Sequence, residues 1–181
     1  MARLEDYNST LALQGISDLI IDDVGDIRFT DTDYAYILVV SDSPMRQQLV
    51  TWRFRSSTGQ IQVMDNSLAF ANGIAFSRDG KTLHITESEL ESYSDIPTRG
   101  TGNFYNYPIN IQFNGTGARN VCAWNVAWQG HDHTHAVITW KRVIFRTLDG
   151  APEGLKVAAN KYLVIGGGRA PGVDITDELG N

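Results

Sequence analysis

The sequence predicts an all-β domain, and two observations lead to this fold class. Short runs rich in Ile, Val, Phe, Tyr and Thr alternate with Gly, Asp, Asn and Ser, as strands alternate with turns. A unit of about fifty residues that holds several such runs recurs along the chain, which is typical of a β-propeller blade. A β-sandwich with similar hairpins explains the same periodicity, so both architectures stay open at this level.

The expected strands follow one another along most of the chain. The segments DDVGD, SSTGQ, SRDGK and AANK between paired runs carry residues that favour tight turns. Residues 87–120 are polar and interrupt the rhythm, so we expect a single domain over 1–181 with an insertion there; such long loops are usually functional or disordered. The expected strands are 18–22, 26–31, 35–40, 49–55, 60–65, 73–77, 82–86, 109–113, 136–141, 154–158 and 161–166.

Three segments carry the internal repeat. They are GISDLIIDDVGDIRFTD from Gly15, NGIAFSRDGKTLHITE from Asn72 and EGLKVAANKYLVIGG from Glu153. Each has a polar residue, an apolar strand, a turn, and a second apolar strand that ends in Thr or Gly. This alignment makes Ser17, Asn72 and Glu153 equivalent positions, and the second interval is longer because it contains the insertion.

Composition excludes several classes of protein. The formal net charge of -6 and the pI near 5.1 leave no excess of Lys and Arg for phosphate contacts, so a nucleic-acid partner is not expected. A single cysteine, Cys122, excludes an internal disulfide framework and a thiolate zinc site. No signal peptide or membrane-spanning stretch is visible in this chain, so no membrane partner is expected and the compartment stays undetermined.

The run TWRFRSSTGQIQVMDNSLAFANGIAFSRDGKTLHITES, residues 51–88, resembles the senescence-marker-protein/gluconolactonase family, which includes the fungal lactonohydrolases. The family pattern there is Pro-Asn-Gly-Ile-Ala-Phe-Ser-x-Asp-Gly-Lys-Thr-Leu, and Ala71 replaces its Pro. The opening LQGISDLIIDDVGDIRFTDTDY is similar to the family's Asn-Asp-Leu segment with its Phe-Thr-Asp-Pro-x-Tyr ending. The later DGAPEGLKVAANKYLVIGGGRAPGVDI is similar to its Asp-Gly-x-Pro-Asp-Gly segment. The likeness covers most of the chain outside the insertion.

The resemblance implies a six-bladed β-propeller, of which this chain holds about four blades and begins about two blades late. It also implies metal-dependent hydrolysis of a sugar lactone or a similar small lactone. The implied cofactor is a divalent ion at the top of the central channel, calcium first, with zinc, magnesium and manganese as alternatives that oxygen ligands also accept. Such an ion polarises the lactone carbonyl as a Lewis acid.

The family's functional residues carry over position by position. Asn72 matches a metal-binding Asn, and Glu153 takes the place of the Asp that binds the metal and acts as general base. Glu153 is one methylene longer than that Asp. Ser17 stands where the family has another Asn ligand, and Asp18 matches the Asp beside it, which supports the ligands or contacts the substrate. The family's N-terminal Glu has no counterpart here.

A second hypothesis is a catalytically inactive, truncated propeller remnant that acts at most as a binding or interaction module. Its motivation is the set of departures at Ser17, Glu153 and the missing Glu. Under either hypothesis, the open sheet edges of an incomplete propeller favour self-association.

Weaker signals remain outside this pattern. His131, His133 and His135 in HDHTH would share one side of an extended segment and form a weak alternative metal cluster, although a solvated loop is the favoured interpretation. Cys122 is expected to be a small buried hydrophobic residue. We expect two further groups of residues to be structural. These are Trp124, Trp128 and Trp140, which would pack between blades, and Gly166–Gly168, which would form a tight turn.

Overall fold

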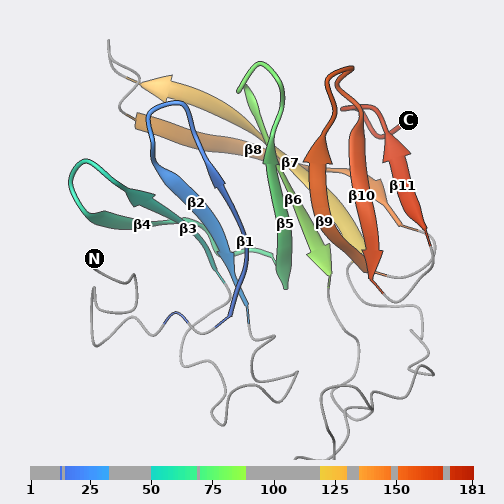
Figure 1. The fold of residues 1–181 in the computed structure, drawn as a ribbon, viewed down its shortest axis with the longest axis horizontal. Helices are drawn as coiled ribbons and strands as arrows, with labels where there is room; N and C mark the ends of the chain where they lie inside the picture. The colour runs from blue at the N-terminus through green and yellow to red at the C-terminus, as the bar shows by residue number, and fades with distance from the viewer. Residues whose placement is uncertain are drawn as a thin grey trace, which may run out of the picture.

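The computed structural model describes residues 13, 15–32, 50–68, 70–88, 119–129, 135–147, 151–168 and 172–181. These residues form three antiparallel sheets that stand side by side (Figure 1). The first sheet holds β1 (Ile16–Ile21), β2 (Ile27–Asp31), β3 (Val50–Arg55) and β4 (Gln60–Asp65). The second holds β5 (Ala71–Phe76), β6 (Thr82–Ser88), β7 (Arg119–Gln129) and β8 (His135–Arg146), and the third β9 (Ala151–Val157), β10 (Leu163–Gly168) and β11 (Val173–Thr176).

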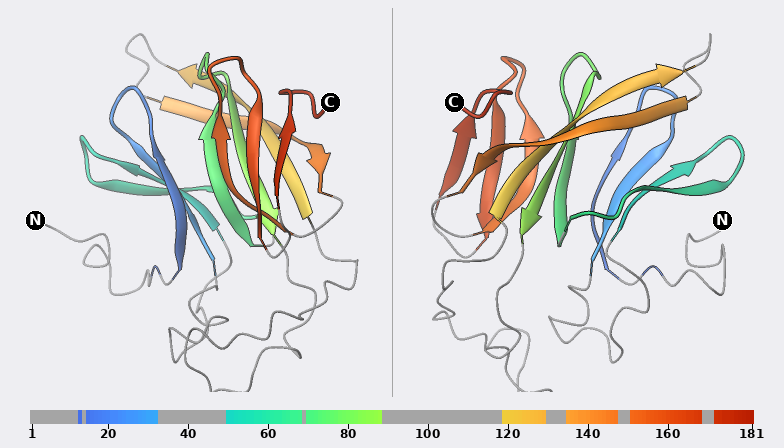
Figure 2. Two further views of the ribbon diagram at one scale, coloured as in Figure 1. Left: turned by 45° about the vertical axis from the view of Figure 1, so that its right-hand side comes forward. Right: turned by 180° about the vertical axis from the view of Figure 1, so that it is seen from behind.

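Each sheet is a meander in which every strand pairs with its neighbour along the chain. The first strands β1, β5 and β9 lie next to one another, run in the same direction and begin at the same end of the molecule (Figure 1). Later strands lie progressively farther out, and Figure 2 shows β7 and β8 from behind as two long ribbons on the outer side of the middle sheet. This radial order is that of propeller blades. The sequence predicts about four blades in the chain, and its described part forms three sheets.

Two apolar clusters hold the sheets together. Between the first and second sheets, Ile20 and Met64 pack against a buried cluster that includes Ile74, Leu83 and Ile85. Between the second and third sheets, the buried cluster consists of Ala75, Val121, Leu155, Leu163 and Ile165. The sheets alternate side chains between their two faces, so consecutive residues of β5, such as Ile74 and Ala75, serve the two different interfaces.

The inner hairpin turns repeat from sheet to sheet. Gly25, Gly80 and Lys161 occupy the same place in the three turns, with φ of 83°, 67° and 71°. The amide of each donates to the carbonyl three residues earlier at 2.9 Å. Lys161 adopts a left-handed conformation that costs an L-residue about 1–2 kcal/mol, and the two glycines avoid this cost. The common geometry confirms the repeat that the sequence alignment identified.

Several strands differ from the prediction. The sequence predicts no strand where β7 lies, because Arg119, Asn120 and the small Cys122 and Ala123 have weak β-propensity. Strand β7 lies between β6 and β8, and Val121 is buried in one inter-sheet cluster while Cys122 and Val126 are buried in the other, so an alternating pattern is absent. Strand β11 is four residues long and was also missed. Segments 35–40 and 109–113 lie outside the described residues, as does the part of the insertion from 89 to 118.

Two smaller predictions were wrong. Trp140 does not pack between blades: its side chain is 81% exposed on the outer strand β8. It has φ of 61° in a strand whose register shifts, which turns the ring away from the core. The run Gly166–Gly168 is the end of β10 and forms no turn. Among the residues that the structure describes, no helix is long and apolar enough to cross a membrane.

Candidate functional site

A β-bulge interrupts the inner hairpin of every sheet at the same place. In each case two residues of the inner strand stand opposite one residue of its neighbour, so the regular ladder of hydrogen bonds is broken there. The two-residue bulges are Ser17–Asp18 in β1, Asn72–Gly73 in β5 and Glu153–Gly154 in β9. The residues opposite them are Thr30, Thr86 and Gly166.

Threonine hydroxyls replace the broken ladder and also join adjacent sheets. The hydroxyl of Thr30 accepts a hydrogen bond from the amide of Asp18 at 3.2 Å. It donates in turn to the carbonyl of Asn72 in the next sheet at 2.7 Å. One side chain therefore fixes both the bulge of its own sheet and the start of the neighbouring inner strand.

The second sheet repeats this bridge. Thr86 accepts from the amide of Gly73 at 2.7 Å and donates to the carbonyl of Glu153 at 2.6 Å. Thr86 is fully buried, so these bonds form away from bulk water, where an unmade bond is costly. Close approach of the inner strands also requires Gly73, because a Cβ there would lie 2.4 Å from the carbonyl oxygen of Glu153.

The bridges place the three predicted ligand residues in equivalent positions. Ser17, Asn72 and Glu153 occupy the first place of successive bulges, near the common end at which β1, β5 and β9 begin (Figure 1). Ser17 and Glu153 are exposed and Asn72 is half-buried. The structure therefore confirms that these three positions are equivalent, and their roles in metal binding stay a prediction.

Asp18 has a structural contact that the sequence did not reveal. Its Oδ2 accepts a hydrogen bond from the amide of Ile74 at 3.1 Å, which ties β1 to β5. Its Oδ1 accepts from the amide of Leu19 at 2.9 Å. The ammonium of Lys156, on β9, lies 3.7 Å from Oδ2, so a positive charge reaches Asp18 from the third inner strand. Lys156 is largely exposed, and this ion pair contributes little to stability.

Comparison with known proteins agrees with this geometry. No protein-family model matches the chain. It is 31% identical over 159 residues to the lactonohydrolase oryH of Aspergillus oryzae, and 32% identical over 164 residues to the lactonohydrolase oryL of the same organism. These matches cover 86% and 90% of this chain but 32% and 35% of the relatives, so the chain spans about a third of their length.

Solved structures give the architecture. A gluconolactonase of Xanthomonas campestris superposes with a TM-score of 0.65 at 21% identity, over 95% of this chain and 46% of that one. A luciferin-regenerating enzyme superposes with a TM-score of 0.63 at 12% identity, over 99% of this chain and 46% of that one. The chain is similar to lactonohydrolases in sequence and to gluconolactonase-like proteins in fold. Its fold is part of a six-bladed β-propeller, as the sequence resemblance implied.

The bulge residues carry the donor types that a hard metal ion accepts. A carboxylate, an amide oxygen and a hydroxyl are all hard oxygen ligands of the kind that calcium, magnesium and manganese accept. Among the described residues, no group of three His, Cys, Asp or Glu side chains could hold an ion. The set Ser17, Asn72 and Glu153 contains one carboxylate, so any ion there would keep several water ligands.

The histidine cluster lies largely outside the residues that the structure describes. His131 and His133 are outside the described residues. His135 begins strand β8, and its side chain is likewise not described. The metal hypothesis for this cluster therefore stays a prediction. Cys122 is fully buried, and burial raises the pKa of its thiol to about 12, so it is a packing residue as expected.

The residues that sequence reasoning missed are the bridging threonines. A signal for them was present, because Thr30 and Thr86 stand before an acidic residue in FTD and ITE at equivalent places of the repeat. The pattern showed strands ending in Thr or Gly but not that the hydroxyl joins two sheets. The contact between Lys156 and Asp18 had no such signal, since a lone lysine in a strand is common on any surface.

Proposed function

We propose that the protein to which this chain belongs hydrolyses a sugar lactone or a similar small lactone with the help of a hard divalent ion. The observation that carries the proposal is the row of oxygen donors in equivalent bulges of three adjacent inner strands. Bulges recur next to active sites because they re-aim side chains. Support comes from the relatives, which are named as lactonohydrolases and, among structures of the same fold, a gluconolactonase.

Asn72, Glu153 and Ser17 would hold the ion, with calcium as the first candidate and magnesium, manganese or zinc as alternatives. When bound, the ion would stabilise the negative charge that develops on the lactone carbonyl oxygen. The backbone at two of these positions is well fixed, because the carbonyls of Asn72 and Glu153 each accept a threonine hydroxyl. A fixed backbone holds a ligand residue in place, and misplaced groups weaken catalysis.

Glu153 would act as the general base. Its exposed side chain is accessible to water, and a carboxylate can take a proton from a water molecule that attacks the lactone carbonyl. The ring C–O bond then breaks, and the released oxygen takes up a proton to give the hydroxy acid. Asp18 would serve a positioning role here, since its carboxylate already binds the amide of Ile74.

The experiment measures opening of glucono-δ-lactone by the purified chain with calcium, magnesium, manganese or zinc present. Glu153→Gln should lower kcat by about 10²–10⁴-fold, the usual contribution of a general base, while the thermal midpoint stays unchanged. Asn72→Ala should abolish the upward shift of the midpoint that calcium causes in the wild-type chain. The second readout depends on binding and needs no turnover.

Glu178→Gln provides a matched control, because it makes the same chemical change in the turn after β11. It should leave both turnover and the calcium shift intact. Full activity of Glu153→Gln would refute the base assignment. A calcium shift that survives both Asn72→Ala and Glu153→Gln would refute the proposed ligand set.

The second candidate is a binding module without turnover, and one contact favours it. The ammonium of Lys156 already brings a positive charge to within 3.7 Å of Asp18, beside the proposed ion site. A cation there competes electrostatically with a metal. Binding of a lactone or its hydroxy acid by calorimetry, with no turnover under any metal, would identify the chain as such a module.

A further inference from the structure

The outer strands of the first sheet carry a pocket of about 400 Å³. Arg53, Arg55, Gln60, Ile61 and Gln62 of β3 and β4 line it. Arg53 stands opposite Gln62 and Arg55 opposite Gln60, so these four long polar side chains share one face of the sheet. A volume of this size is typical of sites for small molecules.

The pocket lies on the face that the first sheet turns towards the second. Arg53 stands opposite Arg28, and Arg28 stands opposite Ile20, so all three side chains are on this face. Ile20 packs against the cluster shared with the second sheet. The guanidinium carbon of Arg28 lies 4.9 Å from the centre of the Phe76 ring on β5. The pocket therefore belongs to the side between two described sheets and not to either end of the row of sheets.

The pocket is remote from the candidate ion site. Strands β1 and β3 run in the same direction, because each pairs antiparallel with β2 (Figure 1). Arg55 is the last residue of β3, whereas Ser17 stands near the start of β1. A ligand in the pocket would therefore lie at the opposite end of the first sheet from the bulges.

Arg53 forms the fixed base of the pocket. Its side chain is 3% exposed. Its Nε donates to Oδ2 of Asp26 at 2.8 Å, and its Nη2 donates to the same oxygen. Charge-assisted bonds of this kind fix the plane of the guanidinium. Arg55 is half-buried, and Gln60 and Gln62 are exposed, so these three side chains line the entrance.

The charges around the pocket favour an anion. Arg28 pairs with Asp22 and Arg53 pairs with Asp26, and both pairs are buried. Burial lowers the pKa of Arg28, the hydrogen bond with Asp22 opposes this shift, and the charge of Arg53 adds to it. The positive charges of the two arginines are therefore close enough to repel each other. Arg55 adds a third guanidinium, so these five side chains together carry a net positive charge.

We propose that this pocket binds a small hydroxy acid, with its carboxylate on the guanidiniums of Arg53 and Arg55 and its hydroxyl groups on the amides of Gln60 and Gln62. A guanidinium presents parallel N–H donors that match the two oxygens of a carboxylate. A glutamine amide both donates and accepts, as a hydroxyl group requires. The proposal stands independently of lactone hydrolysis, because the pocket and the ion site share no residue.

The test titrates gluconate into the purified chain by isothermal calorimetry with EDTA present. We expect saturable binding of one gluconate per chain, and no binding of sorbitol, which has the hydroxyl groups without the carboxylate. Arg55→Gln should weaken the affinity about tenfold or more, since it removes hydrogen bonds to a charged group. Gln62→Leu should weaken it about 2–10-fold, the range for a neutral hydrogen bond.

Arg78→Gln is the matched control, because it makes the same change at an exposed turn of the second sheet, and its affinity should equal that of the wild type. Asn72→Ala should also bind gluconate normally. That result separates the pocket from binding at the ion site, and it does not depend on turnover. Thermal melts check that each variant is folded. If Arg55→Gln unfolds, the exposed Gln62→Leu provides the test.

Three outcomes overturn the proposal. One is a folded wild-type chain that shows no binding at roughly 10 mM gluconate, a concentration above the dissociation constant of even a weak specific site. Another is gluconate binding that neither Arg55→Gln nor Gln62→Leu weakens. The last is binding of inorganic sulfate as tightly as gluconate, which would show a general anion site that does not recognise the hydroxyl groups.

Discussion

Gly73→Ala is the sharpest test of how the inner strands pack. The added Cβ would lie 2.4 Å from the carbonyl oxygen of Glu153 and 2.6 Å from the amide nitrogen of Leu155. Both are backbone atoms of β9, so no side chain can swing aside. Ordinary contact needs about 3.5 Å, and β5 and β9 would have to separate by about 1 Å. Overpacking of this kind costs about 1–3 kcal/mol.

Separation of the strands also weakens a hydrogen bond. Thr86 donates to the carbonyl of Glu153 at 2.6 Å, and a shift of that size would stretch the bond beyond useful length. A buried bond lost in this way costs about a further 1 kcal/mol. We therefore expect Gly73→Ala to lower the free energy of unfolding by about 3 kcal/mol. For a domain of this size that is about 6–12 °C in the thermal midpoint.

The assay is a thermal melt followed by tryptophan fluorescence, with Gly154→Ala as the matched control. Gly154 is the equivalent residue of the next sheet, and its Cβ would meet nothing within 4 Å. That variant should melt within about 1 kcal/mol of the wild type, since alanine in a strand is slightly more favourable than glycine. Equal midpoints for the two variants would refute the close approach of β5 and β9.

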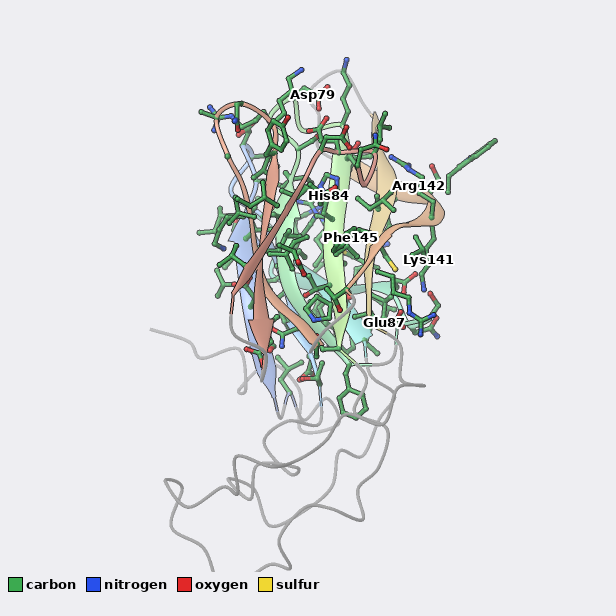
Figure 3. The ribbon with its side chains drawn as sticks, turned by 90° about the vertical axis from the view of Figure 1, so that its right-hand side faces the viewer. Asp79, His84, Glu87, Lys141, Arg142 and Phe145 are labelled. Atoms are coloured by element: carbon green, nitrogen blue, oxygen red, sulfur yellow. The ribbon has the colours of Figure 1, made fainter. Side chains whose placement is uncertain are left out.

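Two further predictions concern buried polar side chains of the middle sheet. Burial first, and the charge of Arg142 second, lower the pKa of His84 to about 4 in the folded chain (Figure 3). The unfolded chain takes up this proton near pH 6.5, so about 3 kcal/mol of stability that is complete above pH 6.5 is lost as the pH falls towards 4. His84→Leu should remove this pH dependence, which melts at pH 7 and pH 5 measure. Thr86→Val should destabilise the chain by about 2–4 kcal/mol in urea, because the amide of Gly73 and the carbonyl of Glu153 lose their partner, whereas Thr139→Val, at an exposed position of β8, should have no effect. An unchanged pH dependence in His84→Leu, or equal urea midpoints for the two threonine variants, would contradict these assignments.

The fold was predictable where each strand carries an alternating or β-branched pattern between clear turns. The hairpins around Gly25 and Gly80 show this best, since a glycine with positive φ stands in the turn and apolar runs stand on both sides. Strand β7 could not be found in this way. It pairs with β6 and β8 along its two edges, and its neighbouring residues Val121 and Cys122 are buried in the clusters on opposite faces, so burial and not propensity decides its conformation.

The positions of the candidate site residues were predictable from the repeat, but the hydrogen bonds that join these residues to the neighbouring sheets were not. Equivalent places in three hairpins follow from aligning Ser17, Asn72 and Glu153, because the same bulge recurs in each. The contact of Asp18 with the amide of Ile74 joins residues 56 positions apart. Such a contact depends on how two sheets are set against each other, and no local pattern encodes that.

The bridging threonines also distinguish the first two sheets from the third. Thr30 joins the first sheet to β5 and Thr86 joins the second to β9, but the equivalent residue of the third sheet is Gly166, which has no hydroxyl. A Cβ at Gly166 would meet only the carbonyl oxygen of Gly154, at an ordinary 3.7 Å, so crowding does not explain the glycine. The threonine bridge therefore joins the first sheet to the second and the second to the third, and any contact made at Gly166 must rely on other interactions.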